Sequence, residues 1–209
     1  MRALNRRDLT RFFAALAARV PCRVTLVLTG GGEAMLLGGR RPTGDLDFGL
    51  SVAARDRHRW PDVETAVAAA TAETGVAVQF SDDIDRWSSV SVPPAIRGSR
   101  RLRTVGRLSV CLLDPACWAV YKLARYLDAD VEDLVAVLRH AHVPWSRLAR
   151  FCGVALRSSP RSTQLILFRR QVEHFFRLQG ATVWGKRFDA ERAVRAFQRA
   201  ARIPVPPRA

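Results

Sequence analysis

The chain has 209 residues, of which 48% are apolar, so it can bury a real core and global disorder is excluded. Lysine and arginine number 34 against 19 acidic residues, giving a formal net charge of +15. That excess favours a polyanionic partner, most simply a nucleic acid, although codon bias in a GC-rich genome is an alternative source. The longest apolar run near the N-terminus, residues 12–18, is too short to span a membrane and lacks a cleavage-site pattern. We therefore expect a cytoplasmic protein with no membrane partner.

The first half of the chain alternates helical and strand patterns, which is typical of a small α/β unit. Glycines at 30–32 predict a turn, and the basic stretch 97–107 is poorly patterned. The elements that we predict are, in chain order, a helix at 7–20, a strand at 22–28, a short helix at 33–37, a strand at 45–52, a helix at 63–74, and strands at 76–80 and 108–113.

The second half of the chain is predicted to be a helical bundle. Asp114 followed by Pro115 is typical of a helix start, with the carboxylate as N-cap and proline at the first position. The helical patterns that follow are interrupted at 128–130, 143–144, 157–160 and 180–186.

The predicted fold class is therefore α+β, with a small mixed β-sheet core flanked by helices and followed by a C-terminal helical bundle. We place the core at residues 1–114 and the helical region at residues 115–209.

The cysteines and histidines indicate no catalytic or metal site. Cysteines stand at positions 22, 111, 117 and 152, without a C-x-x-C pair or a histidine at metal-ligand spacing. They predict buried thiols in a reducing compartment. The four histidines have no nearby Ser or Cys partner pattern, and no nucleophile elbow is present.

Asp45 and Asp47 stand one residue apart in the strand predicted at 45–52. Leu46 and Phe48 alternate with them, so both carboxylates should lie on the face opposite the apolar side chains. Mg²⁺ prefers carboxylate oxygens and waters, and two such ions suit nucleotidyl transfer. Asp45 and Asp47 are thus candidate catalytic residues and ligands of two Mg²⁺ ions; an acidic surface strand is the alternative.

The residues before this pair are suited to binding the phosphates of a nucleoside triphosphate. A turn at Gly31 and Gly32 would let backbone N–H groups approach the phosphates, with a helix N-terminus behind it. Arg41 and Thr43 stand just before Asp45, within reach of phosphate oxygens. The alternatives are a plain strand-to-helix turn and a solvated loop arginine.

A third metal ligand is expected from the acidic segment that follows the strand at 76–80. Asp82 is preferred because it lies two residues beyond the strand, and Asp83 and Asp85 are the other candidates. An acidic turn is the alternative.

The order of these motifs resembles the nucleotidyltransferase superfamily that includes polymerase β, in which Gly-Gly or Gly-Ser precedes Asp-x-Asp at a short spacing. Here twelve residues separate Gly32 from Asp45. More closely, G-G-E-A followed by R-x-T-x-D-L-D-F is similar to bacterial nucleotidyltransferases of the AbiEii/MenT type, which are toxins of toxin–antitoxin systems or their relatives. The resemblance implies a nucleotidyltransferase fold for the core.

A second match to that family lies downstream. In the family, a lysine at the start of the helical half is followed by D-x-x-D on the next helix, as in Lys122 and the segment from Asp130 to Asp133. The resemblance implies that Lys122 is a catalytic residue that contacts the triphosphate, and that Asp130 belongs to the nucleotide site. The alternative, which the sequence favours slightly, is that Asp130 is an N-cap and Asp133 closes a capping box.

The resemblance also implies an activity: metal-dependent transfer of a nucleotide from ATP or another NTP to an acceptor hydroxyl. The acceptor it favours is RNA, at the 3′ end of a tRNA, with growth inhibition as the outcome and a cognate antitoxin protein as a further partner. Protein and small-molecule hydroxyls are alternative acceptors. A non-catalytic RNA-binding or regulatory module that retains the fold is the alternative function.

Overall fold

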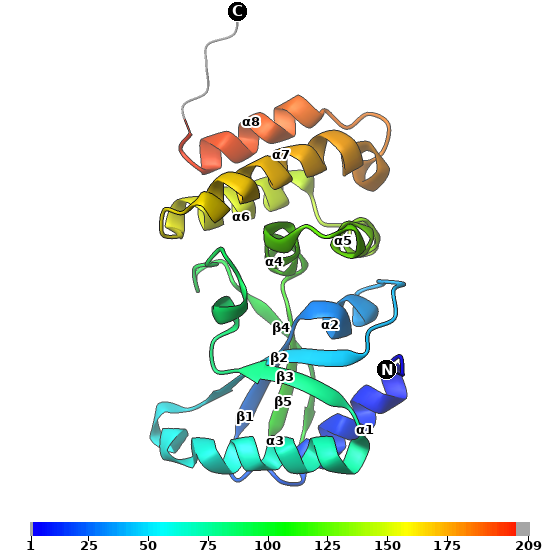
Figure 1. Cartoon of the computed structure of the whole chain (residues 1–209), viewed down its shortest axis with the longest axis vertical. Helices are drawn as coiled ribbons and strands as arrows, with labels where there is room; N and C mark the ends of the chain where they lie inside the picture. Colours follow the sequence, from blue (N-terminus) through cyan, green and yellow to red (C-terminus); the bar gives the residue numbers. More distant parts are fainter. Residues whose placement is uncertain (1, 204–209) are drawn as a thin grey trace, which may run out of the picture. The chain divides into compact units, whose positions relative to one another are not determined.

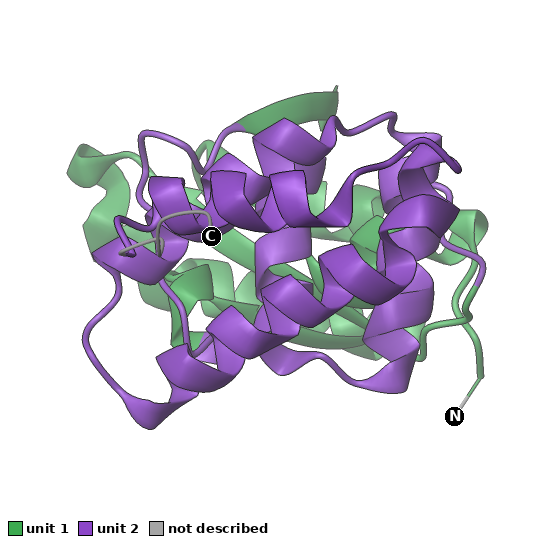
Figure 2. Ribbon diagram, turned by 90° about the horizontal axis from the view of Figure 1, so that it is seen from above, with its two compact units in different colours: residues 1–36, 41–86, 99–113 green, residues 37–40, 87–98, 114–209 purple. Residues whose placement is uncertain are grey.

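The computed structural model describes residues 2–203, which fall into two compact units (Figure 2). Unit 1 comprises Met1–Leu36, Arg41–Arg86 and Ser99–Leu113, and unit 2 comprises Leu37–Arg40, Trp87–Gly98 and Asp114–Ala209. Segments 37–40 and 87–98 therefore group with the second unit, although the sequence placed them in the N-terminal core. None of the helices within residues 2–203 combines the length and the apolar character that a membrane span requires.

Unit 1 is built on a five-stranded mixed sheet with the order β3-β2-β1-β5-β4 (Figure 1). The pairs β1–β5 and β2–β3 are parallel, whereas β1–β2 and β4–β5 are antiparallel. The strands are β1 at Val24–Leu28, β2 at Asp45–Val52, β3 at Ala77–Ser81, β4 at Ser99–Val105 and β5 at Leu108–Leu113.

Helices α1 and α3 pack together on one side of this sheet (Figure 1). Helix α1 begins with a capping box, in which Asn5 accepts from the N–H of Asp8 and the Asp8 carboxylate accepts from the N–H of Asn5. The helices of unit 1 are α1 at Arg6–Ala17, α2 at Gly30–Leu36, η1 at Ala54–Arg59 and α3 at Trp60–Thr74, followed by η2 at Ile84–Trp87.

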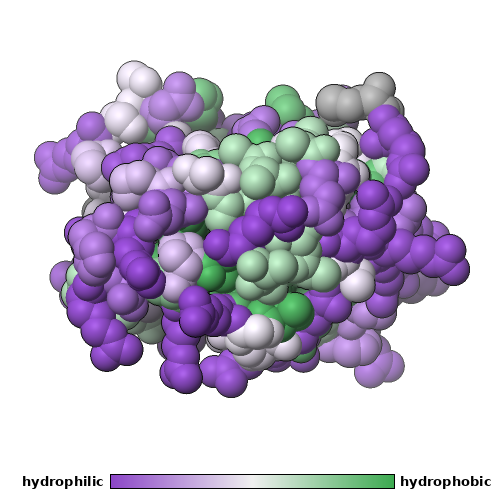
Figure 3. Space-filling model, turned by 90° about the horizontal axis from the view of Figure 1, so that it is seen from below, coloured by the Kyte–Doolittle hydropathy of each residue, from purple (hydrophilic) through white to green (hydrophobic). Residues whose placement is uncertain are grey.

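The apolar face of β2 forms the centre of the unit 1 core. The Phe48 ring is fully buried, and its centroid lies 5.8 Å from those of Phe12 on α1 and Phe80 on β3. Leu46 and Leu50 are buried as well, so the strand and the alternation predicted at 45–52 are confirmed. The surface of unit 1 seen from below is largely hydrophilic around a paler apolar strip (Figure 3).

Two elements of unit 1 differ from the prediction. Gly30–Gly32 form the first turn of α2 instead of a turn before it, and the N–H of Glu33 donates to Thr29 O at 3.2 Å. The basic stretch 97–107 contains β4, an edge strand with mostly exposed side chains. Backbone pairing with β5 holds this strand in place. Because most of its side chains are exposed, its sequence lacks the apolar alternation of a half-buried strand.

Unit 2 contains five helices within the described residues: α4 at Pro115–Arg125, α5 at Asp128–His140, α6 at Trp145–Ser158, α7 at Thr163–Trp184 and α8 at Ala190–Ala200. The predicted start of α4 is confirmed, because the Asp114 carboxylate accepts from the N–H of Ala116 at 3.0 Å. Helix α7 ends at Trp184, inside the break predicted at 180–186. Gly180 lets α7 pack closely against Phe188, because a Cβ atom on Gly180 would overlap the Phe188 ring.

The chain therefore has a mixed α/β fold, with a five-stranded sheet in unit 1 and a helical unit 2. The four cysteines are buried and free, which confirms the prediction of buried thiols.

Candidate functional site

Asp45 and Asp47 lie half-buried on one face of β2, opposite the buried side chains of Leu46 and Phe48. Neighbouring strands fix this part of β2 on both sides. The N–H that follows β1, at Thr29, donates to Asp47 O at 3.0 Å, and Asp47 pairs in register with Gln79 of β3. The two carboxylates therefore occupy a defined place on the sheet.

The first turn of α2 lies directly against Asp47. Gly30 has φ +60°, and a Cβ atom on it would lie 2.8 Å from Asp47 Cγ and closer still to Oδ2. A side chain at position 30 would therefore strain the backbone and displace the carboxylate. Glycine at this position allows backbone and carboxylate to approach each other, which the sequence alone did not reveal.

Thr43 holds the other carboxylate. Its hydroxyl is 3.1 Å from Asp45 O and 3.2 Å from Asp45 Oδ1, so one proton is shared between two acceptors. A Cβ atom on Gly31 would lie 2.6 Å from Thr43 Oγ1, so Gly31 makes room for that hydroxyl. Thr43 thus positions Asp45, a role different from the phosphate contact that was expected of it.

The other two residues expected to bind phosphate are less directly placed. Gly32 is buried, and a Cβ atom on it would lie 2.6 Å from Leu46 Cδ1. It therefore packs toward the apolar side of β2. Arg41 is half-buried in the segment that leads to Thr43, near enough in sequence for its guanidinium to be a candidate phosphate donor.

Asp82 follows the last residue of β3 that pairs with β2. Asp82 lies one residue beyond the last register pair, Gly49 with Ser81, and three residues beyond the position level with Asp47. That separation is about 10 Å along a strand. The Asp82 carboxylate is 54% exposed and lies 3.1 Å from Arg86 Nη1.

The other two acids of this segment form a capped turn. Ser81 Oγ accepts from the N–H of Asp83 at 3.1 Å, and Asp83 Oδ1 accepts from the N–H of Asp85 at 3.0 Å. Among residues 2–203, no three His, Cys, Asp or Glu side chains are placed to hold a metal ion together. A third metal ligand from this segment stays a prediction.

The donor set at β2 still fits Mg²⁺. This ion keeps several waters and binds through one or two carboxylates together with substrate phosphates, so it does not need a cage of protein ligands. Asp45 and Asp47 supply two carboxylates on one face, and Thr43 orients the first of them.

Lys122, Asp130 and Asp133 meet in a buried cluster within unit 2. Lys122 Nζ lies 2.9 Å from Asp130 Oδ1 and 3.1 Å from Asp133 Oδ2, and the lysine side chain is only 6% exposed. Arg125 donates twice to Asp130, from Nε to Oδ2 at 2.7 Å and from Nη2 to Oδ1 at 2.6 Å. Two cations and two carboxylates balance in charge.

The protonation of Asp130 follows from these contacts. Burial raises the pKa of this carboxyl, but the hydrogen bonds from Arg125 and Lys122 outweigh burial and hold its pKa below the ordinary value. The cluster joins α4 to α5. Contact of Lys122 or Asp130 with a triphosphate stays a prediction.

The capping roles predicted for these acids were wrong by a few positions. Helix α5 has Leu127 as N-cap, and the N–H of Leu127 donates to Asp130 Oδ2 at 3.2 Å. Asp130 is therefore the third residue of the helix, and Asp133 lies in the next turn, turned toward Lys122. Helix α5 begins at Asp128, three residues earlier than it would if Asp130 were the N-cap.

Two further residues belong to the site although the sequence did not single them out. Gly30 provides the close approach to Asp47, and Gln79 stands level with Asp47 on the adjacent strand. Only the parallel register of β2 and β3 reveals the second. Comparisons of the chain with protein families, with characterised proteins and with solved structures found no match.

Proposed function

We propose that the chain is a metal-dependent nucleotidyltransferase, with Asp45 and Asp47 holding Mg²⁺ together with the phosphates of a nucleoside triphosphate. The observation that carries the proposal is the meeting of three features in unit 1: the two carboxylates on one face of β2, the glycine turn that leaves room for Asp47, and the hydroxyl that positions Asp45. A strand with two solvated acids would need neither the glycine nor the hydroxyl.

Each residue then has a distinct task. Asp45 and Asp47 would hold the metal, Thr43 keeps Asp45 oriented, and Gly30 leaves room for the Asp47 carboxylate. Arg41 is proposed as a donor to a phosphate oxygen. Bound Mg²⁺ would neutralise phosphate charge and polarise the acceptor hydroxyl.

The net charge of +15 supports an RNA acceptor. The resemblance to the AbiEii/MenT type supports the 3′ end of a tRNA in particular, and with it a toxin whose partner is an antitoxin. Protein and small-molecule hydroxyls remain the alternative acceptors of the same reaction.

One observation favours a second candidate function. At the level of Asp47 the adjacent strand carries Gln79, an amide, where a third carboxylate would strengthen a metal site. A module that binds nucleotide or RNA without transferring anything would tolerate this residue.

The experiment is transfer of α-labelled nucleotide from each of the four NTPs, with Mg²⁺, to total tRNA and to protein. We expect labelled RNA from the wild type and none from Asp45→Asn or Asp47→Asn. Asp62→Asn is the matched control, because it makes the same change in an exposed acid at the start of α3, and it should retain transfer.

The two candidates separate in the same experiment. Binding of an NTP with Mg²⁺ but no transfer to any acceptor supports the non-catalytic module. If the wild type neither binds nor transfers any of the four NTPs, the enzyme proposal fails. RNA binding that weakens steeply with salt and is unchanged in the Asp45→Asn variant would then point to binding through charge alone.

A further inference from the structure

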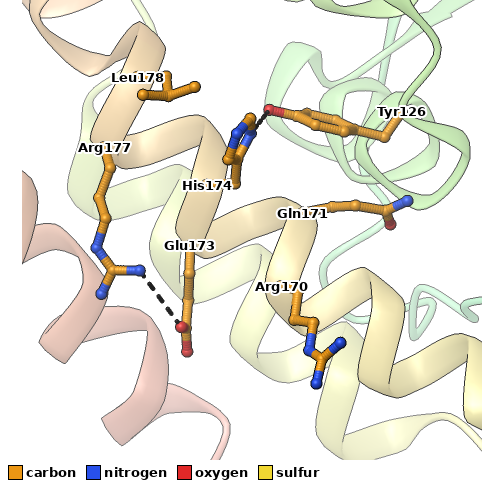
Figure 4. Close-up of a pocket in the computed structure, with 7 residues that line it drawn as sticks. All are labelled: Tyr126, Arg170, Gln171, Glu173, His174, Arg177 and Leu178. Atoms are coloured by element: carbon orange, nitrogen blue, oxygen red, sulfur yellow. Dashed lines mark hydrogen bonds and ion pairs between the residues drawn. The ribbon is translucent and has the colours of Figure 1, made fainter.

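Unit 2 carries an open groove on the outer side of α7, with a cavity volume of about 430 Å³ (Figure 4). Its walls include Tyr126, at the end of α4, and Arg170, Gln171, His174 and Leu178 on α7. We call these five residues the α7 groove.

One cation of the groove, Arg170, has no partner within the part of the chain that the structure describes. Glu173 beside it is already held by Arg169 Nε and Gln198 Nε2, both at 3.0 Å, and the neighbouring Arg177 pairs with Glu191 at 2.8 Å. Within residues 2–203, Arg170 makes no ion pair or hydrogen bond, and its side chain is exposed. The acids here are satisfied, so the guanidinium of Arg170 is available to an anion from outside.

Aliphatic side chains accompany this cation along the helix. Ile166, Arg170, His174 and Leu178 follow one another at intervals of four residues and so lie along one line of α7. Ile166 is 56% exposed and Leu178 59%. Leu127, next to Tyr126, is 55% exposed. Exposed aliphatic side chains thus lie on both sides of Arg170 along the helix, and exposed apolar side chains beside a cation suit the binding of an amphipathic partner.

The wall of the groove opposite α7 is fixed in place. Tyr126 ends α4 in a left-handed conformation with φ 56°, and its hydroxyl lies 2.9 Å from His174 Nδ1 (Figure 4). The two rings meet edge to face at 5.8 Å. On α7 itself, Gln171 Oε1 is buried without a hydrogen-bond partner among the described residues.

We propose that the α7 groove docks an acidic amphipathic helix of a partner protein. An apolar side chain of that helix packs between Leu178 and Tyr126, a carboxylate pairs with Arg170, and further apolar residues extend toward Ile166. The aliphatic flanks favour protein over RNA, because sites for single strands depend on open aromatic faces and the Tyr126 ring is already engaged by His174. This inference does not depend on nucleotidyl transfer.

The probe is a fluorescein-labelled synthetic helix of about 18 residues, long enough to follow the line from Ile166 to Leu178. It carries leucine at positions i, i+4 and i+7 and glutamate on the flanks, and its binding to the full chain is measured by anisotropy. Arg170→Glu and Leu178→Asp should each weaken binding roughly tenfold or more, as expected when an ion pair or a buried leucine is lost. Both side chains are exposed, so melting temperatures should not change.

Arg161→Glu is the matched control, because it reverses an exposed arginine just before α7 and outside the groove, and it should bind the probe as the wild type does. The proposal is overturned if neither groove variant weakens binding, or if a peptide with serine in place of the leucines binds equally well. It is also overturned if single-stranded RNA displaces the peptide and loses affinity in the same two variants, since the groove would then be a nucleic-acid site.

Discussion

The carboxylate of Asp47 occupies space that any side chain on Gly30 would need. A Cβ atom on Gly30 would lie 2.8 Å from Asp47 Cγ, and Gly30 has φ +60°. The position of the Asp47 carboxylate on β2 and that of the Gly30 backbone in α2 therefore depend on each other. Most of the proposed chemistry depends on this one approach.

Substituting Gly30 with alanine should therefore cost more than backbone strain. Gly75 provides the comparison, since it has φ +67° but nothing within 4 Å of its Cβ position. We expect Gly75→Ala to lower the free energy of unfolding by about 1 kcal/mol, the usual cost of a left-handed residue with a side chain. Gly30→Ala should lower it further and abolish nucleotide transfer. Equal losses in urea denaturation would contradict the contact.

The Thr43 hydroxyl should affect the rate of nucleotide transfer, because it positions Asp45. Thr43→Val removes the two hydrogen bonds to Asp45 while it keeps the shape of the side chain. We expect a drop in the transfer rate of roughly tenfold, corresponding to about 1.4 kcal/mol of lost positioning. Thr43→Ser keeps the hydroxyl and should recover most of the rate. A serine variant as slow as the valine variant would exclude this role.

The buried cluster around Lys122 should be a large contributor to stability. Lys122→Met removes the ammonium that lies between Asp130 and Asp133, both fully or nearly fully buried. Breaking a buried ion pair on one side typically costs about 3–5 kcal/mol. Asp82→Asn, which breaks an exposed pair with Arg86, should cost at most about 1 kcal/mol. Similar losses from both substitutions in chemical denaturation would refute the structural role of Lys122.

Stability should fall in acid partly through Asp130. Its pKa is lowered in the folded chain from the ordinary value of 3.8, because the hydrogen bonds from Arg125 and Lys122 outweigh burial. The contribution is therefore present above 3.8 and is lost as the pH falls through the folded pKa. We expect the free energy of unfolding of Asp130→Asn to vary less with pH below 3.8 than that of the wild type. Parallel curves would exclude Asp130 as the source.

The thiols should resist modification while the chain is folded. All four cysteines are buried, and burial raises the pKa of Cys152 well above its ordinary value. The same cause raises the pKa of Cys111, although the charge of Arg101 opposes it. Because the thiolate is the reactive form, a disulfide reagent should label the native chain slowly and all four thiols at once in denaturant. Fast labelling of the native chain would contradict this burial.

The strands that the sequence predicted well are those with one clearly buried face. Asp45–Val52 and Leu108–Leu113 were predicted with their observed bounds, because apolar residues in them follow the period of the pleat or fill a buried strand. Strand β4 was missed, because it lies at an edge and exposes Arg100, Arg101 and Leu102. Its stability comes from backbone pairing, which leaves little trace in side-chain pattern.

The site was predictable only where a local period determines it. Period two places Asp45 and Asp47 on one face, and the structure agrees. The approach of Gly30 to Asp47 depends on how α2 packs on β2, and the distance of Asp82 from the pair depends on the register of β3. The spacing of Lys122 and Asp130 suggested that the two residues belong together. It did not show that their ion pair is buried, because burial follows from the packing of α4 on α5.

The strand order of unit 1 also constrains how the aspartate pair can be assembled during synthesis. Strand β1, which hydrogen-bonds to β2, pairs on its other side with β5, so that Val24 lies beside Leu108. In a nascent chain that ends before β5, one side of β1 has no strand to hydrogen-bond with. The sheet that carries Asp45 and Asp47 is then incomplete. Because pairing over such a separation in sequence is slow, the acids should come into position late in folding. A truncated chain that ends before residue 108 should therefore not transfer nucleotide.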